Sequence, residues 1–267
     1  MTVEQPHFKK PPIIEVVCSV EFEPIEAFQS AHFGDYWSRI KYDFPDTQDV
    51  APVERMNSNQ GDSITLRIRT SPPLPRVWFV GKSEHELIQL QDNRFMYNWR
   101  KLDIDDGEYP RFETVFKAFK KHWDEFVSFV EGRFGDLHIK QLELSYINEI
   151  HESGTSKNIS DLPDILCSTS ISSKKNGFLP RLNGFNWKTA YLLPNNCGHL
   201  TVNAMNALPK PQEPLILRLD IVATGMPNNE MADPLNDWFN LAHDWVVNGF
   251  LDVTCEDAQK NKWERIE

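Results

Sequence analysis

The residues of this chain that could bind a charged or aromatic ligand lie in its first half, in short segments of alternating apolar and polar residues. They are Arg67, Arg69, Gln91, Arg94, Trp99 and Arg100. Arg67 and Arg69 are two residues apart in such a segment, so both should project from the polar face of one strand. Guanidinium groups beside an exposed aromatic ring can bind phosphates, carboxylates or bases. The same residues are also compatible with an ordinary solvated sheet face, on which Arg67 and Arg69 pair with Glu15 or Glu21.

Sequence motifs for catalytic or cofactor chemistry are not recognisable. Gly81-Lys82-Ser83 is similar to the end of a phosphate-binding loop, but Arg76 occupies the position where that motif requires its first glycine. The acidic residues within 103–108 lack the ligand spacing of a calcium-binding loop, which favours a solvated turn. His122 and His243 fall within helical patterns, where a histidine is more often a packing residue than a base or a ligand. We therefore assign no catalytic residue, no metal site and no cofactor from the sequence.

The strongest structural pattern lies at the midpoint of the chain, in residues 109–150. Apolar residues recur there at three- and four-residue spacing, which predicts a helix over 109–134 with one buried stripe. The stripe consists of Phe112, Val115, Phe116, Phe119, Trp123, Phe126, Val127 and Val130. Because it is mostly aromatic, a wide surface such as a β-sheet is its natural partner. Gly135 ends this helix, and a strand over 137–150 follows, with a bulge near Lys140 where the alternation changes phase.

The remaining patterns predict further strands and two more helices. The strands are expected at 13–22, 64–69, 76–81, 87–91, 95–99, 185–193, 200–204 and 215–222. Residues 33–44 have the spacing of a short helix, and residues 231–250 have that of a second long aromatic helix. The sequence therefore predicts an α+β fold, in which a curved antiparallel sheet carries both long helices on one face.

The order of these elements divides the chain into two halves, residues 1–135 and 136–267. Each half reads as a strand, a short helix, several strands with a proline-rich turn, and a long helix. This order is similar to the TATA-binding-protein-like, helix-grip architecture, in which a duplicated β-α-β(n)-α unit forms one continuous sheet and a single compact domain. Duplication and an accidental symmetry of one α+β domain are both compatible with the sequence, because the halves are not similar letter by letter.

The composition limits which partners the chain can bind. It has 267 residues and a formal net charge of −11, so nonspecific binding to nucleic acid is disfavoured unless a local basic face is formed. Its four cysteines, Cys18, Cys167, Cys197 and Cys255, contain no C-x-x-C pair and are expected to be free thiols. The polar N-terminal residues and the lack of a long apolar run predict a cytoplasmic protein that does not span a membrane.

Several short stretches resemble a sporadically distributed prokaryotic family of proteins of about this length and of unknown function. They are Pro11–Val16, Leu90–Phe95 with Asn98–Arg100, Tyr109–Phe112, Tyr146–Ile150, Ala242-His243 and Trp263–Arg265. The resemblance covers nearly the whole chain and implies no activity. The patchy distribution of that family is typical of genes carried in mobile defence or toxin–antitoxin operons.

Three functions are compatible with the sequence. The first is a non-enzymatic binding module that recognises a protein partner or a small ligand, since the structural elements are complete and no catalytic set is assembled. The second is nucleic-acid binding through the arginine-bearing sheet face. The third is an enzyme whose acid–base pair is assembled from distant residues, such as Asp220 with His199 or Glu143.

Overall fold

The computed structural model describes residues 6–53, 74–102, 109–151, 165–167, 184–207, 216–228 and 230–266. Nine strands form one continuous antiparallel sheet, which confirms the predicted α+β class. In spatial order the strands are β3 (Asp46–Val50), β4 (Arg76–Val80), β5 (Glu86–Gln91), β6 (Arg94–Arg100), β2 (Ile13–Phe22), β7 (Ile139–His151), β10 (Ile216–Gly225), β9 (His199–Ala207) and β8 (Asn186–Leu192). The predicted strand 64–69, with Arg67 and Arg69, lies outside the described residues.

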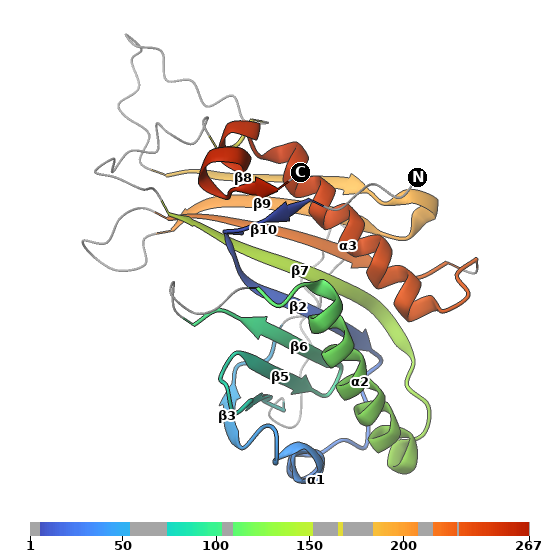
Figure 1. Ribbon diagram of the computed structural model, residues 1–267. Coiled ribbons are helices and arrows are strands. Elements are labelled where there is room, and N and C mark those ends of the chain that lie inside the picture. Colours follow the sequence, from blue (N-terminus) through green and yellow to red (C-terminus); the bar gives the residue numbers. More distant parts are fainter. Residues whose placement is uncertain are drawn as a thin grey trace.

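The two long helices, α2 (Phe112–Phe134) and α3 (Pro234–Val253), lie against the same face of the sheet, as predicted (Figure 1). The buried stripe of α2 contacts β6 through Phe126, whose ring centroid is 5.2 Å from that of Phe95. The short helix α1 (Ser30–Ile40) packs beside α2, where Tyr36 contacts both Phe126 and Phe79. None of the helices within the described ranges has the length and apolar character needed to cross a lipid bilayer.

The centre of the sheet is the pairing of β2 with β7, and it contains the bulge that the sequence predicts. Glu21 is opposite Gln141, whereas Phe22 is opposite Ile139, so Lys140 is the extra residue on β7. This bulge restores the inward direction of the apolar residues on both sides of it. The strands of residues 1–135 lie on the β2 side of this pairing, and those of residues 136–267 lie on the β7 side.

One strand of the sheet is not among those that the sequence predicts. It is β3 at Asp46–Val50, which follows α1 and begins directly after Pro45. Val53 leaves the sheet edge and exchanges backbone hydrogen bonds with the Gln91 side chain, at 3.0 and 3.2 Å. Residues 46–50 show no alternation of apolar and polar side chains, because both faces of this edge strand are exposed to solvent. The hydrophobic pattern of the sequence therefore does not predict this strand.

A second, two-stranded sheet joins the first and last described segments. β1 (His7–Phe8) pairs with β11 (Arg265–Ile266). Beside it the Phe8 ring packs edge-on against Phe250 at 5.8 Å and against Trp263 at 6.4 Å. Phe250 belongs to α3, so this small sheet fixes the N-terminal segment next to the second long helix.

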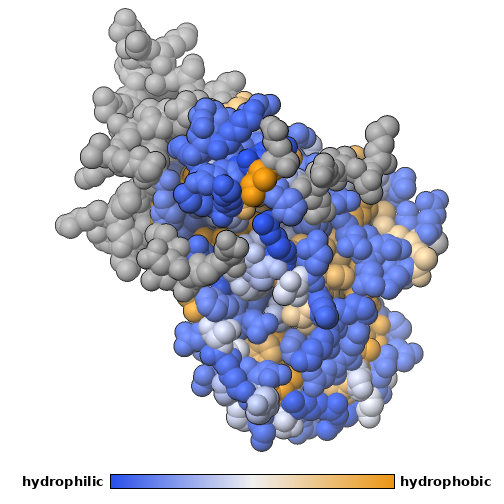
Figure 2. Space-filling model, viewed as in Figure 1, coloured by the Kyte–Doolittle hydropathy of each residue, from blue (hydrophilic) through white to orange (hydrophobic). Residues whose placement is uncertain are grey.

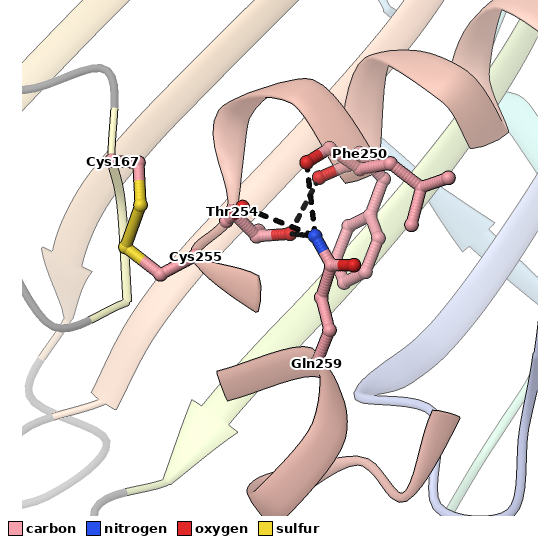
Figure 3. Close-up of a disulfide and its surroundings, with 6 residues drawn as sticks. Cys167, Phe250, Thr254, Cys255 and Gln259 are labelled. Atoms are coloured by element: carbon pink, nitrogen blue, oxygen red, sulfur yellow. Dashed lines mark hydrogen bonds between the residues drawn. A yellow bond between two sulfur atoms is a disulfide. The ribbon is translucent and has the colours of Figure 1, made fainter. Parts of the chain in front are cut away.

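The prediction that all four cysteines are free thiols is wrong for one pair. Cys167 and Cys255 form a disulfide with a Cα–Cα distance of 5.1 Å, at the C-terminal end of α3 (Figure 3). Backbone hydrogen bonds hold the two segments together, from Cys167 to Val253 at 3.1 Å and from Cys255 to Ile165 at 2.8 Å. The two cysteines are 88 residues apart, and only the fold brings them together. Cys18 and Cys197 are buried and free, as predicted.

Removing this disulfide is expected to lower the free energy of unfolding by about 2–4 kcal/mol, because the crosslink restricts a long loop of the unfolded chain. Urea denaturation of the C167S/C255S double variant and of the wild-type protein, each with and without dithiothreitol, measures the difference. Dithiothreitol should destabilise the wild-type protein and leave the double variant unchanged. Equal stability of the oxidised wild type and the variant would contradict the expectation.

Candidate functional site

A cavity of about 160 Å³ lies where the start of α2, the second half of α3 and the N-terminal segment meet above the centre of the sheet. We call it the inter-helix pocket. Its apolar lining comprises Pro6, Phe8, Pro11, Pro12, Ile13, Phe112, Ile221, Val246, Val247 and Phe250, and its polar lining comprises His7, Tyr109, Arg111, Glu113, Tyr146, Asn148 and His243. An apolar cavity of roughly 150 Å³ accepts benzene, so this one has room for one ring-sized group.

Two tyrosine hydroxyls form the polar end of the pocket wall. The Tyr109 and Tyr146 hydroxyl oxygens are 2.9 Å apart, which is a hydrogen bond in which either group can donate. Burial raises the pKa of both phenols, so both keep their protons at neutral pH. One of the two protons bridges the oxygens. The other remains able to bond a further acceptor.

His243 lies flat against Phe112, with ring centroids 4.0 Å apart and an interplanar angle of 5°. Burial lowers the pKa of His243 from 6.5 to about 4, although Glu113 and Asp244 act in the opposite direction. The imidazole is therefore neutral at physiological pH and forms a flat, uncharged wall of the pocket. Asn148 is fixed nearby, because its side-chain amide donates to the Leu219 carbonyl at 2.9 Å.

The entrance of the pocket carries charge. His7, Arg111 and Glu113 line the cavity and are solvent-exposed, so the opening lies among them. Arg111 is the N-cap of α2 and has φ 71° and ψ 154°, a conformation that few residues other than glycine adopt. Such a backbone costs on the order of 1–3 kcal/mol and persists only where the surroundings impose it. Here it turns the chain so that Phe112 enters the core while Arg111 stays at the opening.

The surface around this region is otherwise hydrophilic. Figure 2 shows that the face carrying α2 and α3 is dominated by hydrophilic residues, with scattered hydrophobic patches between them. Phe112 and Val246 are buried, so much of the apolar lining is internal. A ligand would therefore reach this buried apolar lining only by entering the pocket.

The candidate residues chosen from the sequence do not gather at this pocket. Arg94 is on the far face of the sheet, only 3% exposed, and its guanidinium donates to Glu21 at 2.6 Å. Gln91 is buried on the same face and bonds Val53 and Asn93. The Nε of Arg100 donates to the Glu84 carbonyl at 2.9 Å.

Trp99 does not lie beside these arginines. It faces the helices, is buried, and its ring centroid is 5.2 Å from that of Tyr109. The alternation of Phe95, Tyr97 and Trp99 along β6 places all three on the helix side, opposite Arg94 and Arg100. Trp99 therefore supports the pocket wall behind Tyr109.

The far face of the first-half strands is an internal polar layer. A chain of hydrogen bonds crosses four strands, from Arg76 to Gln89 at 2.9 Å, from Gln89 to Asn98 at 2.9 Å, and from Asn98 to Glu15 at 2.6 Å. Burial raises the pKa of Glu15. Most polar atoms of this layer bond to one another, so it offers few free groups to a ligand. Among the described residues, the buried Nε atoms of Arg76 and Arg94 and the Nε1 of Trp78 have no hydrogen-bond partner.

The acid–base pairs considered for an enzyme are not brought together. His199 and Glu143 are both opposite Thr224, on the two strands that flank β10. Asp220 is four residues from Thr224 along β10, which corresponds to about 13 Å. Within the described part of the chain, no group of three histidine, cysteine, aspartate or glutamate residues is placed to hold a metal ion.

The sequence alone does not reveal the inter-helix pocket, although several residues of its lining lie within recognisable sequence stretches. Four of the stretches that carry the family resemblance each contribute to the lining: Pro11–Val16, Tyr109–Phe112, Tyr146–Ile150 and Ala242-His243. Their separation in the sequence concealed their convergence. No family model matches the chain, and no curated protein matches it. Its function is therefore argued from the geometry of the site.

Protonation of the buried histidines is expected to destabilise the fold in acid. Burial lowers the pKa of both His243 and His122 to about 4. Between pH 6.5 and pH 4 the unfolded chain binds more protons than the folded chain, so stability falls as the pH falls through this window. Each histidine contributes up to about 3 kcal/mol of this loss.

Urea denaturation between pH 7 and pH 4 of the wild type, His243→Gln and His122→Gln measures this effect. The stability difference between each variant and the wild type should shrink as the pH falls. Buried carboxyl groups with raised pKa values, such as Glu15 and Glu143, act in the opposite sense but cancel in this difference. A difference that is independent of pH would show that the replaced histidine titrates normally.

Proposed function

We propose that this protein is a non-enzymatic binding module, and that the inter-helix pocket holds a small ligand with one ring-sized apolar group. The observation that carries the proposal is the cavity of about 160 Å³ between the two long helices and the sheet. Close-packed protein interiors rarely leave a void much larger than a water molecule. A void of this size with polar groups at one end has the character of a ligand site.

The polar groups of the pocket favour binding over catalysis. A general acid or base works best when its pKa lies near the operating pH. The pKa of His243 is about 4, and burial raises those of Tyr109 and Tyr146. At neutral pH these three side chains are uncharged, and the two tyrosine hydroxyls can bind a ligand by hydrogen bonds.

The position of the pocket also supports a duplicated, TATA-binding-protein-like origin, which we propose for the fold. From the centre outward, the first half contributes β2, β6, β5 and β4, and the second half contributes β7, β10, β9 and β8. In each half, the long helix follows the strands that this half contributes to the large sheet. The pocket takes Tyr109 and Phe112 from the first half and Tyr146 and His243 from the second, so it lies at the junction of the halves.

Small ring compounds test this function directly. Phenol and indole should raise the melting temperature and bind saturably in calorimetry, because ligands that bind only the folded state stabilise it. Val247→Phe should abolish this binding by placing a ring inside the cavity. Val127→Phe is the matched control: this valine is also half-buried in a long helix but does not line the pocket, so binding should persist.

Two results would overturn the proposal. One is the absence of any stabilisation of the wild-type protein by either ring compound. The other is undiminished binding by Val247→Phe, which would place the ring elsewhere on the protein.

A further inference from the structure

The entrance of the inter-helix pocket carries one positive and one negative charge, two residues apart. Arg111 and Glu113 both line the cavity and are both exposed. Residues two apart at a helix start point in different directions, so the two side chains do not face each other. Neither forms an ion pair with another residue in the described part of the chain. Both charges are thus available at the opening.

Both charges also act on the polar end of the pocket. Arg111 lowers the pKa of the Tyr109 phenol, and Glu113 raises it. Burial raises the pKa of Tyr146, and Glu113 acts in the same direction. Burial lowers the pKa of His243, and Glu113 partly opposes this effect. These directions agree with the geometry, in which both charged residues line the same cavity as the two tyrosines and His243.

The N-terminus of α2 adds to the positive side of this entrance. Its N-cap, Arg111, makes no side-chain capping hydrogen bond to the first turn. The unpaired backbone N–H groups of a helix start carry a partial charge of about +0.5. A ligand carboxylate would therefore be favoured beside Arg111, whereas a ligand ammonium group would be favoured beside Glu113.

We propose that the ligand of the inter-helix pocket is an aromatic α-amino acid in its zwitterionic form, with its ring in the cavity, its carboxylate at Arg111 and its ammonium group at Glu113. This proposal rests on the pocket being a ligand site. A simple anion would be repelled by Glu113, and a simple amine by Arg111 and the helix end. A neutral ring compound would use neither charge. Only a zwitterion complements both, and the cavity has room for one ring.

The Tyr109–Tyr146 pair extends the proposal to the ring substituent. These hydroxyls share one hydrogen bond and retain a second proton for donation. A phenol oxygen on the ligand ring could accept it, so L-tyrosine should bind at least as tightly as L-phenylalanine. L-Phenylalanine lacks this phenol oxygen, but the Tyr109 and Tyr146 hydroxyls still bond to each other when it binds. Its affinity should therefore be only moderately lower than that of L-tyrosine.

Calorimetry on the full-length protein compares L-phenylalanine with three analogues that each lack part of the head group. 3-Phenylpropionate lacks the ammonium group, phenethylamine lacks the carboxylate, and L-phenylalaninamide lacks the carboxylate charge. We expect L-phenylalanine to bind roughly tenfold or more tightly than each analogue, as for the loss of one charge-assisted hydrogen bond. Equal affinity of L-phenylalaninamide would contradict the role of the carboxylate and indicate recognition of a peptide N-terminus.

Charge-neutral variants assign each half of the head group to its partner. Arg111→Gln should remove the preference for L-phenylalanine over phenethylamine, and Glu113→Gln should remove the preference over 3-phenylpropionate. Lys117→Gln and Glu131→Gln are the matched controls, because both residues are exposed on α2 and do not line the pocket. If the controls change the preference as much as the two test variants, long-range charge and not the entrance decides it, and the proposal is wrong.

The outcomes separate this proposal from the proposed function. If phenol and indole bind and Val247→Phe blocks them, but L-phenylalanine is no tighter than its analogues, the amino-acid ligand is wrong and the ring-binding pocket stands. If no ring compound binds, both proposals fail.

Discussion

The packing of aromatic side chains from both long helices onto one face of a continuous sheet is the interaction on which the rest of this structure depends. Phe119 of α2 and Phe239 of α3 meet with ring centroids 5.0 Å apart, directly above the sheet. Burying each such ring contributes roughly 1.5–3 kcal/mol, and aromatic pairs add to this. The helices can share these contacts only if both lie on the same face of the sheet, next to each other above the β2–β7 pair. The strand order brings that about by placing one half of the chain on each side of the β2–β7 pairing.

The inter-helix pocket is a consequence of this packing. The rings of α2 and α3 fill the space between the helices as far as the Phe112–His243 stack. Beyond that stack, shorter side chains such as Val246 and Val247 face the N-terminal segment across a gap. The small β1–β11 sheet and the Phe8–Phe250 contact hold that segment in place. The cavity therefore has walls from five parts of the chain, and no single element defines it.

The face of the sheet that points away from α2 and α3 is polar in the first half of the chain. Its first-half strands carry charged and amide side chains that are buried or half-buried, and most of their polar atoms are hydrogen-bonded to one another. Arg94 illustrates the cost of this arrangement, because a buried guanidinium without its Glu21 partner would be strongly unfavourable. An arginine held in this way specifies strand register and is poorly placed to bind phosphate. The disulfide at the end of α3 adds a covalent constraint on the second half of the fold.

Local patterns in the sequence determined the strands of the large sheet other than β3, the two long helices and the face of the sheet that these helices share (Figure 1). They also located the bulge at Lys140, because a change in alternation phase is visible within one segment. The alternation along β6 also predicts that Trp99 faces the helices, on the opposite side of the strand from its neighbour Arg100. Only the tertiary structure decided that Cys167 meets Cys255, that Arg94 is neutralised by Glu21, and that Tyr109, Tyr146 and His243 share one pocket. Periodicity reports which way a side chain points within its own element, whereas a pair or a cavity depends on distances between elements far apart in the chain.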